Sequence, residues 1–401
     1  MRILFVTPQI SWPLSNGGEI RDWNILQGLI EAGDTDALVF AADDYRDAPQ
    51  AFSGCKKVIL AGRRHVVPSP THQRRYQSWW GRALLVLGSA LPFEWLGDAR
   101  QELREDLRRQ CDFGSYALVW YATAEASFAL GRIDVPAQIL DGDDFLYVRE
   151  WLLLRRSPPY GSKIWNYLNI AKLWYWERRF PNRFTAVVRC SEEDRKRQPA
   201  RNVEVIPNGT TVPSAVERTP DRRILFVGLL GYPPNRQGME WFLGCVWPHI
   251  RSRVPEVALD IVGREPGPAI QAHDRRNGVV VHGYVEDLGP LYRNAALSVV
   301  PLHAAGGTRL KILESLARAV PVVSTSIGAF GIEASNEHGL VRADQPAAFA
   351  DRCVDLLRDP ETWQSRAMVG RELAQSIYDW RMIRKRVVRL ANRYAPGKNL
   401  P

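Results

Sequence analysis

Short apolar runs alternate with stretches of helical character along the second half of this 401-residue chain. The expected strands are 224–227, 259–262, 279–281, 297–300 and 320–323. The intervening stretches 239–253, 288–296 and 310–319 place apolar residues on one helical face. Strands that alternate with helices predict an α/β fold with a doubly wound parallel sheet, in which ligands bind at the carboxyl ends of the strands.

The first half of the chain repeats this plan less regularly. The expected strand 3–6 ends in a long loop that contains Gly17 and Gly18, and a helix to about residue 32 follows this loop. The other expected strands are 37–40, 56–60, 117–121, 138–140, 186–188 and 203–206. A Pro-Asn-Gly turn at 207–209 and the polar stretch 213–223 separate the halves, which marks a hinge. The sequence therefore predicts two Rossmann-like domains facing each other across a cleft, 1–207 and 208–375, followed by a terminal helical segment, 376–401.

A glycine turn followed by two cations marks the segment after the strand 297–300. Gly306 and Gly307 allow the backbone to approach a ligand closely before a helix that starts near residue 308. Cations in the first turn of a helix cost about 0.3 to 1 kcal/mol each, yet Arg309 and Lys311 occupy that turn. An anion such as a diphosphate between them would remove the conflict. The alternative is that both cations are solvated and that Lys311 only pairs with Glu314.

The order and spacing of several short motifs resemble those of GT-B glycosyltransferases of the large retaining family numbered four. These motifs are Gly17-Gly18, Pro-Asn-Gly at 207–209, Ile224-Leu-Phe-Val-Gly, Tyr232-Pro-Pro-Asn, Ile261-Val-Gly-Arg, His282-Gly-Tyr-Val-Glu-Asp and Gly-Gly-Thr-Arg-Leu-Lys-Ile-Leu-Glu at 306–314. The resemblance covers nearly the whole chain. It implies transfer of a sugar from a nucleotide diphosphate sugar to an acceptor, with retention at the anomeric carbon. Residues 1–207 would bind the acceptor, 208–375 the donor, and 376–401 would form a helix that returns to the first domain.

The resemblance assigns Glu314 to the ribose of the nucleotide, as the second acid of a paired-glutamate motif. A carboxylate suits this role because it only accepts hydrogen bonds and can serve two neighbouring hydroxyl groups. The first acid of the motif would fall eight residues earlier, where this chain has Gly306. Contacts to the donor sugar are then expected from backbone amides at 306–308 or from another residue.

Other donor contacts are expected from loops after strands. The family has an arginine and a lysine after the first strand of the second domain. The corresponding loop here lacks the lysine, and Arg236 could take its place, although a solvent-facing arginine is the alternative. Arg264 directly follows a later strand and is a better placed cation. Tyr284 and Val285 lie where the family usually binds the base, although Tyr284 could equally pack in the core. Uridine, guanosine, thymidine and adenosine diphosphates all stay open. The complete expected donor set is Gly17, Gly18, Arg236, Arg264, Tyr284, Val285, Gly306, Gly307, Thr308, Arg309, Lys311 and Glu314.

An Asp-Gly-Asp-Asp sequence at 141–144 follows the strand 138–140. Asp143 or Asp144 is expected to orient the acceptor hydroxyl or to act as a base, although aspartates after strands are also ordinary turn formers. No essential metal and no cofactor are expected, because no histidine lies near these acids and arginines can stabilise the leaving diphosphate.

Composition bears on the location of the protein. The five cysteines are odd in number and scattered, which predicts reduced thiols in the cytoplasm. The first apolar run breaks at Thr7 and Pro8, so neither a signal peptide nor a membrane span is expected. The polysaccharide or cell-surface glycan assembly implied by the resemblance would fit this location.

The net charge of +9 is concentrated in segments that mix arginine with tryptophan, 63–95 and 149–183, and in the helical segment 377–394. Such segments suit an anionic membrane surface, which favours a lipid-linked saccharide acceptor and peripheral contact with the inner membrane leaflet. The alternative is that the tryptophans pack in cores and the arginines form a solvated face. Nucleic-acid binding is disfavoured, because no recognised module appears.

Two other function classes stay open. A nucleotide-sugar epimerase of GT-B type would share the diphosphate site but need no acceptor. A non-catalytic protein would bind nucleotide without turnover, and Gly306 in place of an acid keeps that hypothesis alive.

Overall fold

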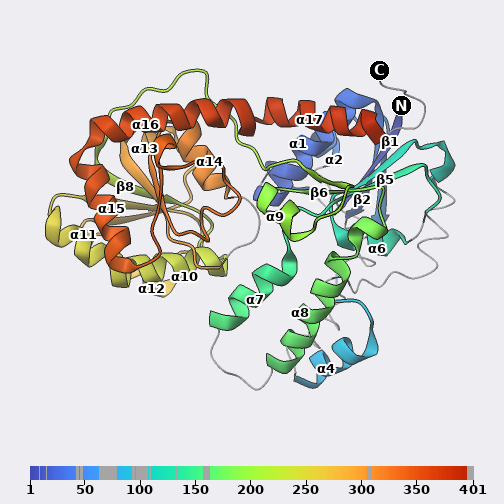
Figure 1. Cartoon of the computed structure of the whole chain (residues 1–401), viewed down its shortest axis with the longest axis horizontal. Coiled ribbons are helices and arrows are strands. Elements are labelled where there is room, and N and C mark those ends of the chain that lie inside the picture. The colour runs from blue at the N-terminus through green and yellow to red at the C-terminus, as the bar shows by residue number, and fades with distance from the viewer. Residues whose placement is uncertain are drawn as a thin grey trace. The chain divides into compact units, whose positions relative to one another are not determined.

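The computed structural model describes residues 1–8, 10–14, 16–41, 45, 48–62, 79–92, 95, 107, 110–131, 133–156, 163–304 and 309–394. The chain divides into two compact units (Figure 1). Unit 1 comprises Met1–Pro207 together with Ile383–Pro401, and unit 2 comprises Asn208–Met382. Each unit is an α/β domain built on one parallel sheet, so the predicted fold class is confirmed.

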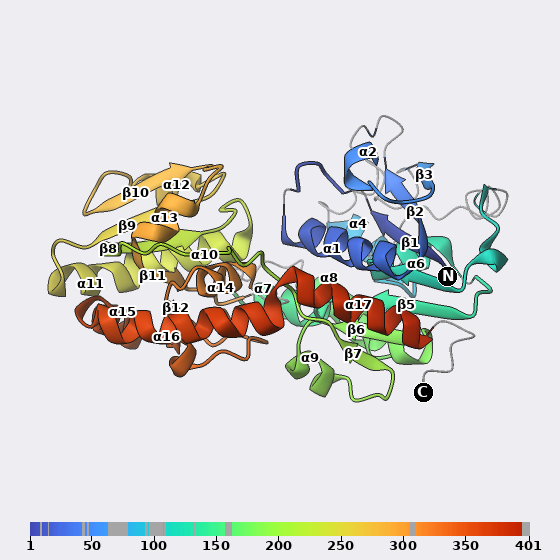
Figure 2. The same ribbon diagram turned by 90° about the horizontal axis from the view of Figure 1, so that it is seen from above.

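The sheet of unit 1 has seven parallel strands in the order β3-β2-β1-β4-β5-β6-β7 (Figure 2). The strands are β1 Arg2–Pro8, β2 Asp34–Ala41, β3 Val58–Gly62, β4 Leu118–Tyr121, β5 Ala137–Asp141, β6 Ala186–Arg189 and β7 Val203–Val205. All seven were predicted from their apolar runs. Their side chains are largely buried because helices cover both faces of the sheet.

The helices of unit 1 follow its strands. They are α1 Gly17–Ala32, α2 Ala48–Ala51, α4 Trp79–Gly88, α6 Ala124–Leu130, α7 Leu146–Arg156, α8 Lys163–Glu177 and α9 Glu192–Arg197. The side chain of Asn16 caps α1 by accepting a hydrogen bond from the N–H of Glu19 at 3.1 Å. Gly28 of α1 meets Val387, where an added Cβ would lie 2.9 Å from the valine Cβ. The last helix therefore packs closely on α1 within this unit.

The sheet of unit 2 has six parallel strands in the order β10-β9-β8-β11-β12-β13. They are β8 Asp221–Val227, β9 Ala258–Val262, β10 Val279–Gly283, β11 Ala295–Val300, β12 Val322–Ser324 and β13 Leu340–Arg342. The sequence predicted the first five but not β13, which is only three residues long. It also assigned 213–223 to a hinge, which was wrong from Asp221 onward. There Arg223 pairs with Asp260 of β9 and continues the strand.

The helices of unit 2 form two layers. They are α10 Pro233–Trp241, α11 Trp247–Arg253, α12 Gly267–Gln271, α13 Gly289–Asn294, α14 Leu310–Ala317, α15 Pro346–Arg358 and α16 Pro360–Leu373. In Figure 1, α10 and α11 lie on one face of the sheet and α13 and α14 on the other. One apolar core joins α10, α11 and α15 to the sheet, and a second surrounds α14.

Two predicted helices are interrupted. A π-helical turn, Phe242–Val246, separates α10 from α11, because Pro248 has no N–H to continue the α-helical ladder. The terminal helix α17 runs over Trp380–Tyr394 rather than from residue 376 or 377. Asp379 is extended and its carboxylate accepts a hydrogen bond from the N–H of Arg381 at 2.8 Å, which caps α17. The helix begins in unit 2 and continues in unit 1 from Ile383.

Candidate functional site

Three loops are joined at the carboxyl ends of β8, β9 and β10 in unit 2. The N–H of Gly228 donates to the carbonyl of Val262 at 2.9 Å, and that of Gly263 donates to Gly283 at 2.7 Å. Gly263 has a φ of 156°, and an added Cβ would lie 1.9 Å from the carbonyl oxygen of Gly228. Only glycine fits this approach, so the backbone itself holds the loops together.

Lys311 of α14 reaches into this group of loops. Its Nζ donates to Oδ1 of Asn235 at 2.7 Å and lies 4.5 Å from the ring centre of Phe226. An added Cβ at Gly228 would approach Nζ to 2.6 Å. Asn235 is fixed in turn, because its Nδ2 donates to the carbonyl of Leu229 at 2.7 Å. The ammonium group is thus aimed at the loop after β8, and the alternative of a solvated Lys311 that only pairs with Glu314 is wrong.

The surroundings of Lys311 make its charge costly. Burial and the nearby positive charge of Arg309 together lower the pKa of Lys311 to about 7, although the charge of Glu314 acts in the opposite direction. The Asn235 oxygen that accepts the hydrogen bond from Lys311 belongs to a neutral amide, so it adds no negative charge. A bound anion would supply that charge and favour the protonated amine.

The start of α14 lies two residues later than predicted. Arg309 is the N-cap, with φ −83° and ψ 101°, and Leu310 is the first helical residue. Arg309 is buried, so its position before the helix is not that of a solvated surface cation. Gly306, Gly307 and Thr308, which were expected to supply backbone amides, lie outside the described residues.

Glu314 lies one turn beyond Lys311 on α14. The hydroxyl of buried Tyr292 donates to its Oε2 at 3.2 Å. Burial raises the pKa of Glu314, whereas the charge of Arg318 and the hydrogen bond from Tyr292 lower it. The guanidinium of Arg318 lies 4.8 Å from the ring centre of Tyr292. Glu314 is therefore held by a neutral donor and a nearby cation.

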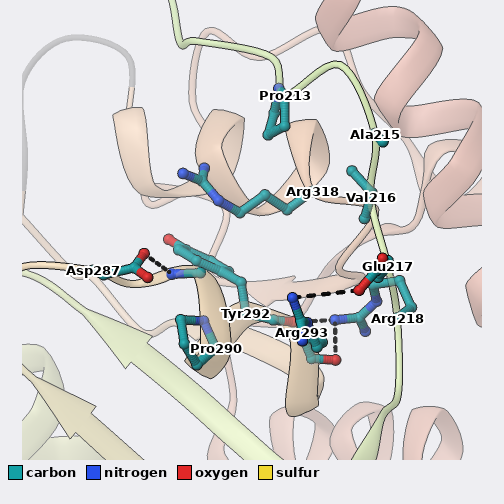
Figure 3. A pocket seen from close by; sticks show the side chains of 11 residues that line it. Pro213, Ala215, Val216, Glu217, Arg218, Asp287, Pro290, Tyr292, Arg293 and Arg318 are labelled. Atoms are coloured by element: carbon teal, nitrogen blue, oxygen red, sulfur yellow. Dashed lines mark hydrogen bonds and ion pairs between the residues drawn. The ribbon is translucent and has the colours of Figure 1, made fainter.

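Tyr292 and Arg318 also line a pocket of about 430 Å³ (Figure 3). An ion pair of 3.4 Å between Arg293 and Glu217 lies at its side, and Arg218 donates to the carbonyl of Ala295 at 2.6 Å. These charged groups already have protein partners. Tyr292 links this pocket to the site, because it lines the pocket and its hydroxyl donates to Glu314.

The other expected donor residues lie on neighbouring loops. Arg264 is exposed after β9, and its guanidinium lies 4.3 Å from the ring centre of Tyr284. Tyr284 is 62% exposed, so it does not pack in the core, whereas Val285 packs against a small apolar cluster. Arg236 is half-buried on α10, with its Cδ near Gly267. The structure thus brings Arg264 and Tyr284 together, and groups Lys311 with Asn235 and Gly228.

A second polar cluster lies in unit 1, at the carboxyl end of β5. Arg21 of α1 makes a two-pronged ion pair with Asp141, with Nε to Oδ2 at 3.0 Å and Nη2 to Oδ1 at 2.9 Å. Both side chains are buried, and Arg21 also donates to the carbonyl of Ile206 at 3.1 Å. This pair ties α1, β5 and the end of β7 together.

The turn that contains Asp143 and Asp144 is held from both sides. The N–H of Asp143 donates to Oδ1 of Asp141 at 3.2 Å, and the carbonyl of Asp144 accepts from Arg189 at 3.2 Å. Asp143 has a φ of 41°, a left-handed conformation that aspartate tolerates better than most residues. Its side chain is 39% exposed and lies 3.8 Å from Arg21. The turn-forming role is present, and the catalytic role stays a prediction.

The glycine pair was predicted in the loop before the first helix, which was wrong, because α1 begins at Gly17 with Asn16 as its cap. Gly17 and Gly18 are exposed in its first turn, and Glu19 accepts a hydrogen bond from the hydroxyl of Ser11 at 2.9 Å. On the same helix, burial and the nearby charge of Asp141 raise the pKa of Asp22 well above its usual range. Thr7 donates to its carboxyl group at 3.3 Å.

Sequence reasoning missed Asn235, Tyr292, Arg21 and Arg189. Asn235 is part of the Tyr232-Pro-Pro-Asn motif but was given no role there. The other three residues do not belong to any motif with a distinctive spacing. All five cysteines are free. Among the described residues, no helix is long and apolar enough to cross a membrane, and no group of three or more acidic, histidine or cysteine side chains is arranged to hold a metal.

Known proteins resemble this chain in part of its sequence and in its fold. Residues 221–359 match the family model described as "Glycosyl transferases group 1". Over 164 residues the chain is 28% identical to an "uncharacterized 44.6 kDa protein in cps region" of Klebsiella pneumoniae. That match covers 39% of this chain and 42% of the relative, so it spans less than half of either.

Solved structures match over nearly the whole chain. Anabaena Alr3699/HepE in complex with UDP is 16% identical, with a TM-score of 0.63 over 98% of this chain and 100% of that one. Sucrose-phosphate synthase from Thermosynechococcus elongatus is 16% identical, with a TM-score of 0.67 over 97% and 98%. TarM is 11% identical, with a TM-score of 0.67 over 98% of each chain. The chain has the GT-B fold, and unit 2 carries the segment that matches the group 1 glycosyl transferases.

Proposed function

We propose that this protein is a retaining glycosyltransferase that moves a sugar from a nucleotide diphosphate sugar to a saccharide or glycolipid acceptor. The observation that supports it most is the placement of Lys311. Its half-buried amine lies beside Gly228 at the end of β8, within the segment that matches the group 1 family. The complex of one structural neighbour with UDP makes a uridine donor the first to test.

Each group in unit 2 has a task in this proposal. Lys311 and Arg309 stabilise the diphosphate as negative charge develops on the leaving group. Glu314 accepts hydrogen bonds from the ribose hydroxyls, and Tyr292 orients its carboxylate. Arg264 and Tyr284 contact the nucleotide from the loops after β9 and β10. Because cationic side chains supply the charge, the proposed reaction needs no essential metal.

Unit 1 would bind the acceptor. Asp143 is the better candidate to orient the attacking hydroxyl, because its side chain is partly exposed while its backbone is fixed by Asp141. With retention, the leaving phosphate would take the acceptor proton. Asp143 would then orient the acceptor hydroxyl and would not need to act as its base. We also propose that this protein acts in the assembly of a cell-surface glycan. The similarity to the cps-region protein of Klebsiella pneumoniae supports this role.

Thermal unfolding with UDP, GDP, dTDP and ADP tests the donor site. A diphosphate present at 100 times its Kd should stabilise the native protein by about 2.7 kcal/mol. The expected result is selective stabilisation by one diphosphate, which Lys311→Met reduces to less than about 1.4 kcal/mol and the exposed control Lys385→Met on α17 leaves unchanged. No response to any of the four would overturn the proposal.

Turnover then separates the three function classes. Incubation of the matching nucleotide sugar with a lipid-linked saccharide should release the diphosphate and form a product whose anomeric configuration, measured by NMR, equals that of the donor. Formation of a second nucleotide sugar without acceptor would indicate an epimerase. Tight binding without any turnover would indicate the non-catalytic protein that Gly306 leaves open.

A further inference from the structure

Helix α8 carries an apolar stripe on its exposed side. Among the side chains of α8 that the structure describes, the exposed ones recur at helical spacing, at 164, 167, 168, 171, 174 and 175, and each of these is apolar or aromatic. The opposite side, which includes Asn169 and Leu173, is buried. A helix on the surface of a soluble domain normally shows the reverse pattern, with polar residues outward. The exposed stripe therefore calls for an occupant.

Helix α4 extends this surface. Its exposed residues include Trp80, Leu84 and Leu87, whose side chains are 73%, 64% and 71% exposed, while Ala83 and Val86 are buried. Two side chains of α8 attach the end of α4: Lys172 donates to the carbonyl of Ser89, and Trp176 donates to that of Ala90 at 2.9 Å. Figure 1 shows α4 and α8 together, projecting with α7 away from the sheet of unit 1.

We define the apolar helical face by Trp80, Leu84 and Leu87 of α4 and Ile164, Tyr167 and Leu168 of α8. It joins two sequence regions that lie more than 70 residues apart, both rich in arginine and tryptophan. Trp151 of α7 continues it, because its ring lies 5.9 Å from that of Tyr167. An isolated exposed tryptophan is ordinary, but several large exposed apolar side chains on three neighbouring helices are not.

The charges around this face are almost all positive. Residues 146–183 contain eight lysines and arginines and only two acids. Of these acids, Glu150 pairs with Arg149 at 3.0 Å, and Glu177 is buried, where it accepts from the N–H of Leu146 at 2.9 Å. Next to the exposed stripe, Arg179 lies 3.7 Å from the ring centre of Tyr175 and Arg178 lies 5.3 Å from that of Trp174. The face therefore presents apolar and aromatic groups bordered by cations.

The same bias holds for the whole unit. Unit 1 contains 34 lysines and arginines against 25 acids, whereas unit 2 contains 19 of each, so the full net charge of +9 belongs to unit 1. A second copy docked through the same face would bring these like charges together, which disfavours a dimer. An anionic lipid surface offers the complementary charge, and tryptophan, tyrosine and arginine all favour its boundary between headgroups and acyl chains.

We propose that the apolar helical face docks on an anionic bilayer, with α4 and α8 lying in the headgroup region. Neither helix is long enough to span the hydrocarbon, since α8 has 15 residues and α4 has 10. The apolar side chains enter the interface, and the arginines that border them contact lipid phosphates. The inference goes beyond the proposed sugar transfer and does not depend on it.

Co-sedimentation of the full-length protein with vesicles tests the inference. One set of vesicles contains phosphatidylcholine alone, and the other contains about 30% phosphatidylglycerol, enough to give a negative surface potential. The expected result is strong binding to the anionic vesicles only. In Leu84→Glu/Leu168→Glu, two acidic groups enter the face, and the partition coefficient should fall by about tenfold or more. Met368→Glu, at an exposed site on α16 of unit 2, should bind like the wild type.

The outcomes are distinguishable. Equal binding of the wild type and Leu84→Glu/Leu168→Glu, or absence of wild-type binding to anionic vesicles, would overturn the proposal. A concentration-dependent dimer that the double variant abolishes, measured by analytical ultracentrifugation, would assign the face to a second copy instead. Circular dichroism and UDP-dependent thermal stabilisation monitor folding of each variant. A protein that binds vesicles but no nucleotide would refute only the proposed sugar transfer.

Discussion

Each unit has a cationic side chain near the carboxyl ends of its strands, but the two cations have partners of different charge. In unit 1, the buried guanidinium of Arg21 meets the carboxylate of Asp141 through two hydrogen bonds. In unit 2, Lys311 is half-buried and donates to the neutral amide oxygen of Asn235. A buried cation compensated by a carboxylate serves structure, whereas a partly buried amine beside a neutral acceptor is suited to an anionic ligand.

The largest effect expected from this contrast is on stability. Asp141→Ala leaves Arg21 buried without its carboxylate and should lower the free energy of unfolding by about 3 to 5 kcal/mol. Urea titration measures the loss. Asp143→Asn is the control, because the Asp143 carboxylate is partly exposed and lies 3.8 Å from Arg21. Asparagine also tolerates the left-handed φ of 41° at this position, so stability should change little. Similar losses in both variants would contradict the structural role of the Arg21–Asp141 pair.

Lys311 should show the opposite profile. Lys311→Met removes a buried amine, so stability at pH 7 should stay or rise, while the affinity for UDP should fall by about 1.5 to 3 kcal/mol, or roughly 10- to 100-fold. Calorimetry with UDP and with uridine separates the phosphate contribution, since uridine affinity should hardly change. Equal losses for the two ligands would remove Lys311 from the phosphate site. This prediction rests on the proposed function.

The lowered pKa of Lys311 also predicts a pH dependence that needs no ligand. Between about pH 7 and the ordinary pKa of 10.5, the unfolded chain binds a proton that native Lys311 does not, so stability rises with pH across this window. The stability of the wild type relative to Lys311→Met should increase by about 1 to 2 kcal/mol from pH 7 to pH 9. Parallel stability curves would show that the amine titrates normally. Lys385→Met, on an exposed part of α17, should give such parallel curves.

The sequence predicted most of the fold, because buried parallel strands appear as apolar runs whatever their neighbours are. It failed where the signal was short or interrupted: β13 has three residues, and Pro248 and Asp379 break helices whose apolar pattern continues through them. β13 was too short to give a pattern, whereas at Pro248 and Asp379 a backbone hydrogen-bonding requirement outweighed the periodic pattern of apolar residues.

The candidate site was predictable only in part, for a related reason. Lys311 and Glu314 stand out because charged residues interrupt an apolar helix after a glycine pair. Their partners do not, since Asn235 is 76 residues away and Tyr292 is 22 residues away. Contacts between separate elements are set by the sheet order β9-β8-β11, which a single sequence does not contain.

The smallest effect separates the ribose role of Glu314 from a structural one. Glu314→Gln keeps the size of the side chain but turns one acceptor oxygen into a donor, so the affinity for both UDP and uridine should fall by about 1 kcal/mol. Tyr292→Phe leaves the carboxylate and removes only the hydroxyl that donates to it at 3.2 Å. The affinity for UDP and for uridine should therefore fall less than in Glu314→Gln. If Glu314→Gln lowers stability without changing either affinity, the carboxylate serves Tyr292 and Arg318 alone. Loss of uridine affinity in Glu314→Gln with unchanged unfolding would place the acid on the ribose, next to the amine that serves the phosphates.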